Sequence, residues 1–272
     1  MLAAMSGRLN LFFPLWIDGG LSRDLLAGAR ALRDYLAPRV RFVEAPCDER
    51  CDPLIERDIA GYAAIRSHLE RASASLDRIA PASLFTVGGG CGIEVPIVSH
   101  LRRRYAGLRV LWLDAHGDLN SPASSLSKHF HGMPLRFLLE AALDEAIGPR
   151  AATLDPSDLT LIGCRDLDPP EARYIGERGI RLIEARDAGT ADPVPDGPPV
   201  YVHLDLDVLD PAEYPNVKCP APGGISIAEA AALIERVMAR SSVVGMSILE
   251  NLAVERATLA RLEPLFALAE GI

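Results

Sequence analysis

The sequence has no long apolar run, no excess of basic residues and no closely paired cysteines. Its 28 lysine and arginine residues are outnumbered by 37 aspartate and glutamate residues, which gives a net charge of −9. A protein that tracks the phosphates of a nucleic acid needs a basic surface, so this charge argues against a nucleic-acid partner. No apolar stretch approaches the roughly 20 residues that cross a bilayer, so we expect no membrane partner.

The cysteines also exclude two classes of site. They stand at positions 47, 51, 91, 164 and 219 and form no Cys-x-x-Cys pair. Neither a disulfide framework nor a zinc ribbon is indicated, and we expect reduced thiols in a cytoplasmic protein. Residues 9–17 are mostly apolar, but Pro14 interrupts them, Asp18 follows, and no small-residue cleavage site comes next. We therefore interpret this stretch as a first strand and not as a signal peptide.

Short apolar runs alternate with longer segments that carry apolar residues at helical spacing. We expect strands at 9–14, 40–44, 83–87, 108–113, 159–163, 180–184, 199–204 and 243–249. We expect helices at 23–36, 54–78, 92–104, 133–146, 170–178, 226–240 and 253–270, the sixth of them opened by a capping box from Ser226 to Glu229. This order predicts an α/β protein, a three-layer αβα fold with a mostly parallel sheet of about eight strands. No linker divides the alternation, so residues 1–272 are expected to form a single domain.

Two acidic motifs follow two of the expected strands. The first places Asp114, His116 and Asp118 two residues apart, and the second places Asp205 and Asp207 two residues apart. Residues at this spacing point to the same face if the extended geometry continues, so each motif brings its side chains together. Four carboxylates in one cleft repel one another unless cations neutralise them, and two divalent ions cancel a formal charge of −4. Oxygen and imidazole ligands suit Mn²⁺ better than a structural zinc ion. A two-metal hydrolase is therefore expected, in which the ions share a water and present it as hydroxide.

Polar clusters come after five of the expected strands. Ligands of open parallel sheets bind beyond the carboxyl ends of the strands, so these clusters should meet at one edge of the sheet. They are Gly88–Gly92, Asp114–Asp118, Arg165–Glu171, the pair Asp205 and Asp207, and Glu250.

From Gly88 to Glu250 the chain resembles the ureohydrolase family, which includes arginases, agmatinases and formiminoglutamases. The run Trp112 to Asn120 is similar to the central metal motif of that family, and Leu204 to Pro211 is similar to its second metal motif. The resemblance implies an arginase-like fold with two Mn²⁺ ions per chain. It also implies that Asp114, His116, Asp118, Asp205 and Asp207 are metal ligands.

Other residues resemble the parts of the family that handle the substrate. The resemblance implies that His131 exchanges protons with the leaving amine and that Glu250 holds the guanidinium group. Asn120, Ser127 and Arg165–Glu171 are similar to the arginase branch, in which such residues hold the α-carboxylate and α-amino groups. The resemblance implies that Asp168 and Glu171 carry this role here. Agmatine has no α-carboxylate, so an arginine-like substrate is favoured over agmatine. Three of these residues have a structural alternative: Asn120 as the cap of a turn, Asp168 as a helix N-cap, and His131 as a packing residue.

The chain departs from the family pattern at Cys91, where a histidine usually supplies the first metal ligand. Three interpretations compete: a thiolate ligand, a neutral thiol that leaves the first metal weakly held, and a small buried residue in a glycine-rich loop. We favour the ligand, because every other ligand position is filled. A cysteine here also resembles a small branch that hydrolyses Nω-hydroxyarginine. His129 and His203 replace small polar residues; His129 is assigned to the substrate's carboxylate, and His203 is expected to pack beside its strand.

These observations predict a metal-dependent amidinohydrolase, a binuclear manganese enzyme that acts on linear amidines. It is expected to cleave the guanidino C–N bond of arginine or Nω-hydroxyarginine with a metal-bridging hydroxide, which yields ornithine and urea or a urea derivative. The alternatives are a non-catalytic metal-binding homologue disabled by Cys91, and a formimino-amino acid hydrolase. The resemblance further implies a homo-oligomer.

Overall fold

An eight-stranded sheet forms the centre of the protein. The computed structural model describes residues 7–48, 51–52, 54–140, 143 and 153–272. The strand order is β2-β1-β5-β10-β9-β6-β7-β8, and all neighbours in this sheet run parallel. The strands are β1 (Arg8–Phe13), β2 (Val43–Glu44), β5 (Ser83–Gly88), β6 (Arg109–Leu113), β7 (Leu159–Ile162), β8 (Arg181–Ile183), β9 (Val200–Asp205) and β10 (Val243–Leu249).

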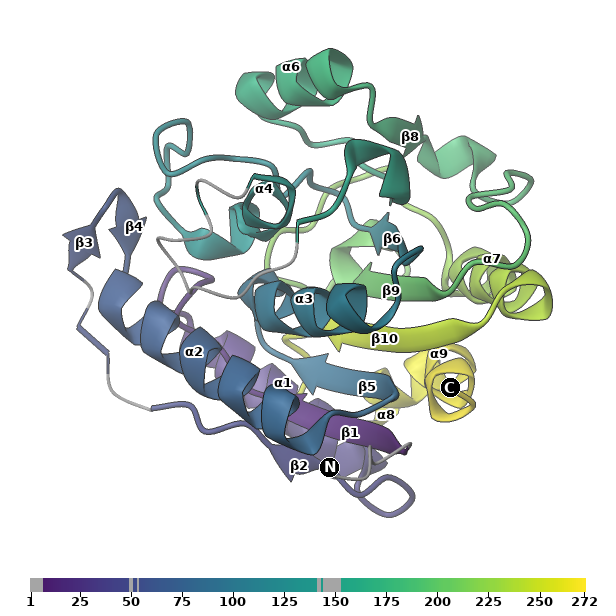
Figure 1. The fold of residues 1–272 in the computed structure, drawn as a ribbon. Coiled ribbons are helices and arrows are strands. Elements are labelled where there is room, and N and C mark those ends of the chain that lie inside the picture. The colour runs from purple at the N-terminus through teal and green to yellow at the C-terminus, as the bar shows by residue number, and fades with distance from the viewer. Residues whose placement is uncertain (1–6, 49–50, 53, 141–142, 144–152) are drawn as a thin grey trace, which may run out of the picture.

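Helices cover both faces of this sheet and complete a three-layer arrangement (Figure 1). Helices α2 (Tyr62–Ile79), α3 (Glu94–Arg104) and α4 (Pro134–Leu139) contribute to the core on one face. Helices α1 (Arg23–Leu36), α7 (Ile227–Arg240) and α9 (Glu263–Glu270) contribute to the core on the other. The central strands are buried on both sides, which explains their continuous apolar sequences and confirms the predicted fold class.

The eight predicted strands all occur, within a few residues of the expected bounds. The first eight residues of the predicted helix 54–78 do not belong to a helix: they contain a hairpin of β3 (Ile55–Glu56) and β4 (Ile59–Ala60). Arg57 and Asp58 form its turn with φ of 51° and 59°, which suits a two-residue hairpin turn. The helix prediction failed there because two isoleucines four residues apart also fit a helix face.

Other helix bounds differ at their ends. Glu140 has extended backbone and ends α4, while 141–142 and 144–146 of the predicted helix 133–146 lie outside the described residues. The predicted helix 253–270 is divided into α8 (Arg256–Leu259), a 3-10 turn (Ala260–Leu262) and α9, which Pro264 opens. The capping box of Ser226 and Glu229 opens α7 as predicted, and α6 (Pro169–Arg178) begins one residue early.

The parallel arrangement decides where the site lies. Strands β5, β6, β7, β9 and β10 are neighbours in the middle of the sheet, and their carboxyl ends share one edge. The five polar clusters predicted from the sequence all follow these strands. Within the described part of the chain, no helix is both long and apolar enough to cross a membrane.

The contact between α1 and the segment after β10 gives a stability prediction. A Cβ atom on Gly28 would lie 1.8 Å from the carbonyl oxygen of Asn251, a backbone atom that cannot move aside. Gly28→Ala should therefore lower the free energy of unfolding by about 2 kcal/mol, as overpacked cores do. Gly176→Ala is the matched control, because Gly176 lies within α6 with nothing inside 4 Å of its Cβ position. Urea denaturation checks both, and equal stability of the two variants would contradict this contact.

Candidate metal centre

The loops after the five central strands surround a cavity of about 190 Å³. Its walls are predominantly polar side chains, in keeping with the polar clusters of the sequence. They are Cys91, His116, Asp118, Asn120, Ser125, Ser127, His131, Gly132, Asp166, Asp168, Glu171, Asp205, Asp207, Cys219 and Glu250. Eleven of the thirteen side chains proposed from the sequence line this cavity. Asp114 lies beneath the lining, and His129 lies outside it.

The glycine-rich loop places Cys91 at the floor of the cavity. A Cβ on Gly89 would lie 1.7 Å from the carbonyl oxygen of Leu15, so only glycine allows the two backbones to pack this closely. Gly92 donates its backbone N–H to the buried carboxylate of Asp18 at 2.9 Å. With the loop held from this side, the Cys91 Sγ lies 3.2 Å from Asp205 Oδ2. The glycines therefore serve close packing, while the thiol faces carboxylates.

Three groups of possible ligand atoms lie at this cavity, and one of them combines Cys91, Asp205 and Glu250. The other two share Asp114. We name Cys91, Asp114 and Asp118 site A, and Asp114, His116 and Asp207 site B. In each group the donor atoms lie within 4.8 Å of one another, and Asp114 belongs to both. The Nδ1 atom of His116 is 3.0 Å from Asp207 and 3.4 Å from Asp114. The sequence motifs thus converge on adjacent positions that share a carboxylate.

Backbone hydrogen bonds fix these carboxylates in place. Asp114 accepts the N–H of His116 at 2.7 Å, and Asp207 accepts the N–H of Ala115 at 3.0 Å. Asp205 in turn accepts the N–H of Asp207 at 2.8 Å. The two acidic motifs therefore hold each other in register from neighbouring strands.

The electrostatics of the cluster favour cations. Burial raises the pKa of Asp118 and Asp205 well above the usual range, and the other carboxylates raise it further. Burial and Asp114 raise the pKa of Asp207 to about 6. Burial also raises the pKa of Asp114, but the nearby imidazoles of His116 and His203 outweigh it and lower that pKa. Mutually repelling carboxylates at this depth need positive charge beside them.

The donor set fits divalent metal ions. Asp118 Oδ2 and Glu250 Oε2 are buried, and neither has a hydrogen-bond partner in the described part of the chain. Burial raises the pKa of the Cys91 thiol well above its usual range, and Asp118 and Asp205 raise it further, so a thiolate here requires a cation. Hard carboxylate oxygens combined with imidazole and one thiol match a first-row divalent metal better than Mg²⁺ or Ca²⁺.

The backbone is strained at two of these positions. Asp118 has φ of 53° and Glu250 has φ of 61°, a left-handed region that residues other than glycine seldom adopt. Both residues lie near strand ends and aim buried carboxylates into the site. Strain of this kind persists where the surrounding structure enforces it, which is common at functional sites.

His131 and Glu250 form a pair in the cavity wall. The Nδ1 atom of His131 lies 3.2 Å from Glu250 Oε1, and its backbone N–H donates to the carbonyl of Asp18 at 3.2 Å. Burial disfavours the charged imidazole, but Glu250 outweighs this and raises the pKa of His131. Burial and Glu250 also raise the pKa of the Asp18 carboxyl to about 7. Asp18 was absent from the sequence-based site, because a single aspartate after an apolar run carries no motif.

The residues expected to hold the substrate's amino acid end lie around the upper part of the cavity. Asn120 donates to Asp168 at 2.9 Å and accepts from Ser124 at 2.8 Å. Glu171 accepts the N–H of Leu119 at 2.9 Å and that of Asp168 at 3.0 Å. Its side chain therefore caps the start of α6 and links this helix to the segment of the first metal motif.

Ser127 and His129 form the last part of this group. Ser127 is exposed, lines the cavity and accepts the N–H of His129 at 3.3 Å. The ring of His129 covers Gly20, whose Cβ would lie 2.6 Å from it. His129 is therefore placed beside the cavity and not in its lining, so its assignment to a substrate carboxylate gains no support from the geometry.

A buried pair that the sequence did not reveal lies beneath site A. The Nδ1 atom of His203 is 2.9 Å from Glu94 Oε1, and both side chains are fully buried. The His203 ring also stacks on Trp112 with centroids 3.7 Å apart, so it packs between strands as expected and makes a polar contact as well. The sequence signal for His203 was its spacing of two residues from Asp205. Glu94 had no such signal, because it is 109 residues away from His203 in the chain.

Comparisons with known proteins agree with this fold. An arginase of Staphylococcus aureus is 33% identical over 178 residues, which are 60% of this chain and 58% of that protein. The solved arginase of Bacillus caldovelox superposes with a TM-score of 0.82 at 24% identity, covering 98% of this chain and 99% of the other. The Entamoeba histolytica arginase in complex with L-ornithine has a TM-score of 0.81 at 19% identity, covering 98% and 100%. The model of the arginase family matches residues 33–253, and the chain belongs to that family.

Proposed function

We propose that this protein is a manganese-dependent amidinohydrolase whose substrate is a guanidino amino acid, arginine or Nω-hydroxyarginine. The observation that carries the proposal is the group of buried, closely spaced carboxylates at a polar cavity, with the His131–Glu250 pair in its wall. Membership of the arginase family supports the reaction class. The proposal treats residues 1–272 as one catalytic domain of a cytoplasmic homo-oligomer.

The metal ions would be held by the residues of sites A and B, together with Asp205. Two divalent cations at such a cluster supply Lewis acidity and lower the pKa of water toward neutrality. The chain supplies the geometry: Asp114 belongs to both groups of donors, and Asp205 lies beside Cys91. Burial of these side chains keeps bulk water away and strengthens their electrostatic effect.

The chain's own residues suit the two ends of such a substrate. Glu250 Oε2 is buried, unpartnered and adjacent to Cys91, so it can accept N–H groups of a guanidinium. At the upper part of the cavity, Asp168 suits an α-ammonium group, whereas Ser127 and Asn120 offer neutral donors to an α-carboxylate. Among the described lining residues none is lysine or arginine, so neutral donors would have to bind that carboxylate.

His131 is placed to move a proton. Its Nδ1 contacts Glu250, which fixes the ring and leaves Nε2 for a proton exchanged at the departing amine. Cleavage of the guanidino C–N bond by water gives ornithine and urea, and the amine leaves with a proton that His131 would deliver. Nω-hydroxyarginine would give hydroxyurea in the same way.

The reaction is testable with purified protein loaded with Mn²⁺. Arginine or Nω-hydroxyarginine should yield ornithine, and agmatine should yield little product because it lacks the α-carboxylate. Liquid chromatography with mass spectrometry measures ornithine, urea and hydroxyurea, with N-formimino-glutamate in the same panel. Turnover of the formimino compound alone would reassign the substrate, and no turnover of any compound by protein that holds two metal ions would refute the proposed activity.

Asp207 tests the metal ligands. Asp207→Ala should bind at least one ion fewer per chain. The substitution removes a carboxylate that would compensate the charge of the ion at site B, and it opens a coordination position. Asp34→Ala is the control, since Asp34 is exposed and forms an ion pair with its neighbour Arg33. Metal content after gel filtration, measured by inductively coupled plasma mass spectrometry, should fall in the first variant and stay unchanged in the second. Full metal content in both would place the ions elsewhere.

Cys91 tests the substrate preference. Cys91→His should hold the first ion more tightly and raise activity on arginine relative to Nω-hydroxyarginine, because an imidazole replaces a soft anionic donor. Cys164→Ser is the control: Cys164 is also buried, and its Sγ donates to the carbonyl of His116 at 2.8 Å, a bond that serine preserves. If Cys91→His changes neither metal affinity nor the activity ratio, Cys91 is not a ligand.

A further inference from the structure

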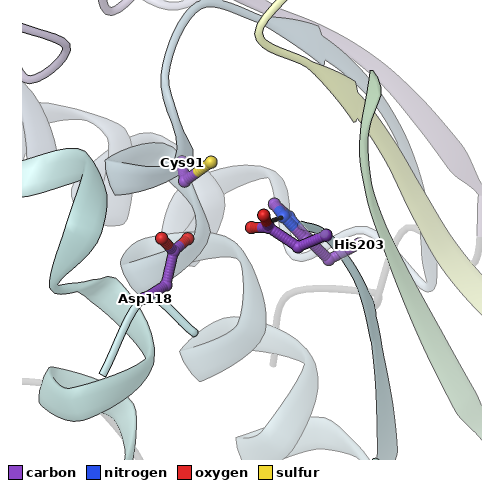
Figure 2. A group of neighbouring side chains, drawn as sticks. Cys91, Asp118 and His203 are labelled. Carbon is purple, nitrogen blue, oxygen red and sulfur yellow. Dashed lines mark ion pairs between the residues drawn. The ribbon is translucent and has the colours of Figure 1, made fainter. Parts of the chain in front are cut away.

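The strongest unexplained feature of the molecule is the orientation of His203. Its side chain is fully buried on β9, and its Nε2 atom has no hydrogen-bond partner among the residues that the structure describes. That atom lies 3.6 Å from Asp114 Oδ2. It also belongs to the group of site A: the donor atoms of Cys91, Asp114, Asp118 and His203 all lie within 4.8 Å of one another. Figure 2 shows Cys91, Asp118 and His203 gathered around one space from three separate segments.

The ring of His203 is fixed from three directions. Sheet register pairs His203 with Trp112 on β6 and with Ser247 on β10, so these side chains form a row across one face. The Trp112 ring stacks on the imidazole at an interplanar angle of 18°. Glu94, the first residue of α3, lies against Nδ1 at 2.9 Å. The imidazole therefore has little freedom to turn.

Glu94 also decides which ring nitrogen is available. Its carboxylate accepts the hydroxyl of Tyr201 at 2.6 Å and the hydroxyl of Ser247. A carboxylate surrounded by donors is an acceptor, so Nδ1 of His203 carries the proton and donates to it. In the neutral ring, the lone pair is then on Nε2 and points at site A. Metal-bound histidines in proteins commonly have this arrangement, with the second nitrogen donating to a carboxylate.

We propose that His203 binds the metal ion of site A through Nε2, with Glu94 as its positioning residue. This inference rests on the proposed metal centre and extends it: site A would combine a thiol from the loop, two carboxylates and an imidazole from the sheet. The competing arrangement is a charged imidazolium that neutralises Asp114 in place of a metal ion. The two arrangements predict opposite effects on metal affinity.

The test compares three forms of the full chain loaded with Co²⁺. His203→Asn removes Nε2 but keeps an amide N–H near the position of Nδ1, so Glu94 retains a donor. His100→Asn is the matched control, because His100 is also buried and its Nε2 lies 3.0 Å from the carbonyl of Pro81, which precedes β5 at the opposite edge of the sheet from the site. Chelator competition measures the affinity of each ion, and visible absorption reports the coordination of Co²⁺. Circular dichroism verifies that each variant is folded.

We expect His203→Asn to weaken one of the two ions at least tenfold and to change the Co²⁺ spectrum, while His100→Asn matches the wild type. Unchanged or tighter binding in His203→Asn would overturn the inference, and tighter binding would identify the charged ion pair with Asp114. Wild-type protein that takes up no metal would overturn the metal centre itself. Two ions with wild-type affinity in His203→Asn would overturn only the role of His203.

Glu94→Gln provides a second test. A glutamine can donate to Nδ1, which moves the ring proton to Nε2 and blocks coordination, so affinity at site A should fall by about tenfold to 100-fold. If both variants unfold, a measurement on the wild-type protein still tests whether His203 binds the metal. Co²⁺-loaded protein should show a strongly shifted imidazole N–H signal in proton NMR that exchanges slowly with D₂O, because the His203 ring is fully buried. Absence of such a signal would overturn the inference.

Discussion

Repulsion between buried carboxylates at one sheet edge is the constraint on which the rest of this structure depends. Asp114, Asp118, Asp205 and Asp207 are all nearly inaccessible to solvent. Asp114 is grouped with Asp118 and with Asp207, and Asp205 is grouped with Glu250. Charges at such depth are stable only when opposite charge or protons compensate them. The protein supplies backbone N–H donors and two imidazoles nearby, yet no described residue forms a hydrogen bond with Asp118 Oδ2. A pair of divalent ions would satisfy this arrangement and give it chemical use.

The parallel sheet produces this concentration of charge. Adjacent strands β9 and β6 end in acidic motifs, while β5 and β10 on the other side of β9 bring Cys91 and Glu250. Close packing of the glycine-rich loop on Leu15 and Asp18 then fixes the floor, and the left-handed backbone at Glu250 turns its carboxylate inward. A rigid frame built from strand ends keeps like charges together against their repulsion, which supports preorganised electrostatics in catalysis.

Much of the fold was predictable from sequence because buried parallel strands are short apolar runs with distinct ends. The hairpin of β3 and β4 was not, since Ile55 and Ile59 satisfy a helical period as well as a hairpin. In the site, the two motifs pointed to the right side chains, but the extended geometry expected of them does not continue: β6 ends at Leu113, Asp118 has left-handed backbone, and Asp207 lies in the 3-10 turn Leu206–Val208. His203 and Glu94 meet only through the packing of α3 on β9, which no local pattern encodes. The roles assigned to the converging residues stay predictions, because proximity alone does not show what they bind.

The central claim is that the carboxylates at this sheet edge hold two metal ions. Anomalous diffraction from crystals of the Mn²⁺-loaded protein tests it most directly, because it locates the metal without assumptions about activity. The account predicts two peaks about 3.5–4 Å apart, one on either side of Asp114, with Cys91 and Asp118 at the first and His116 and Asp207 at the second. A single peak, or peaks away from Asp114, would contradict it.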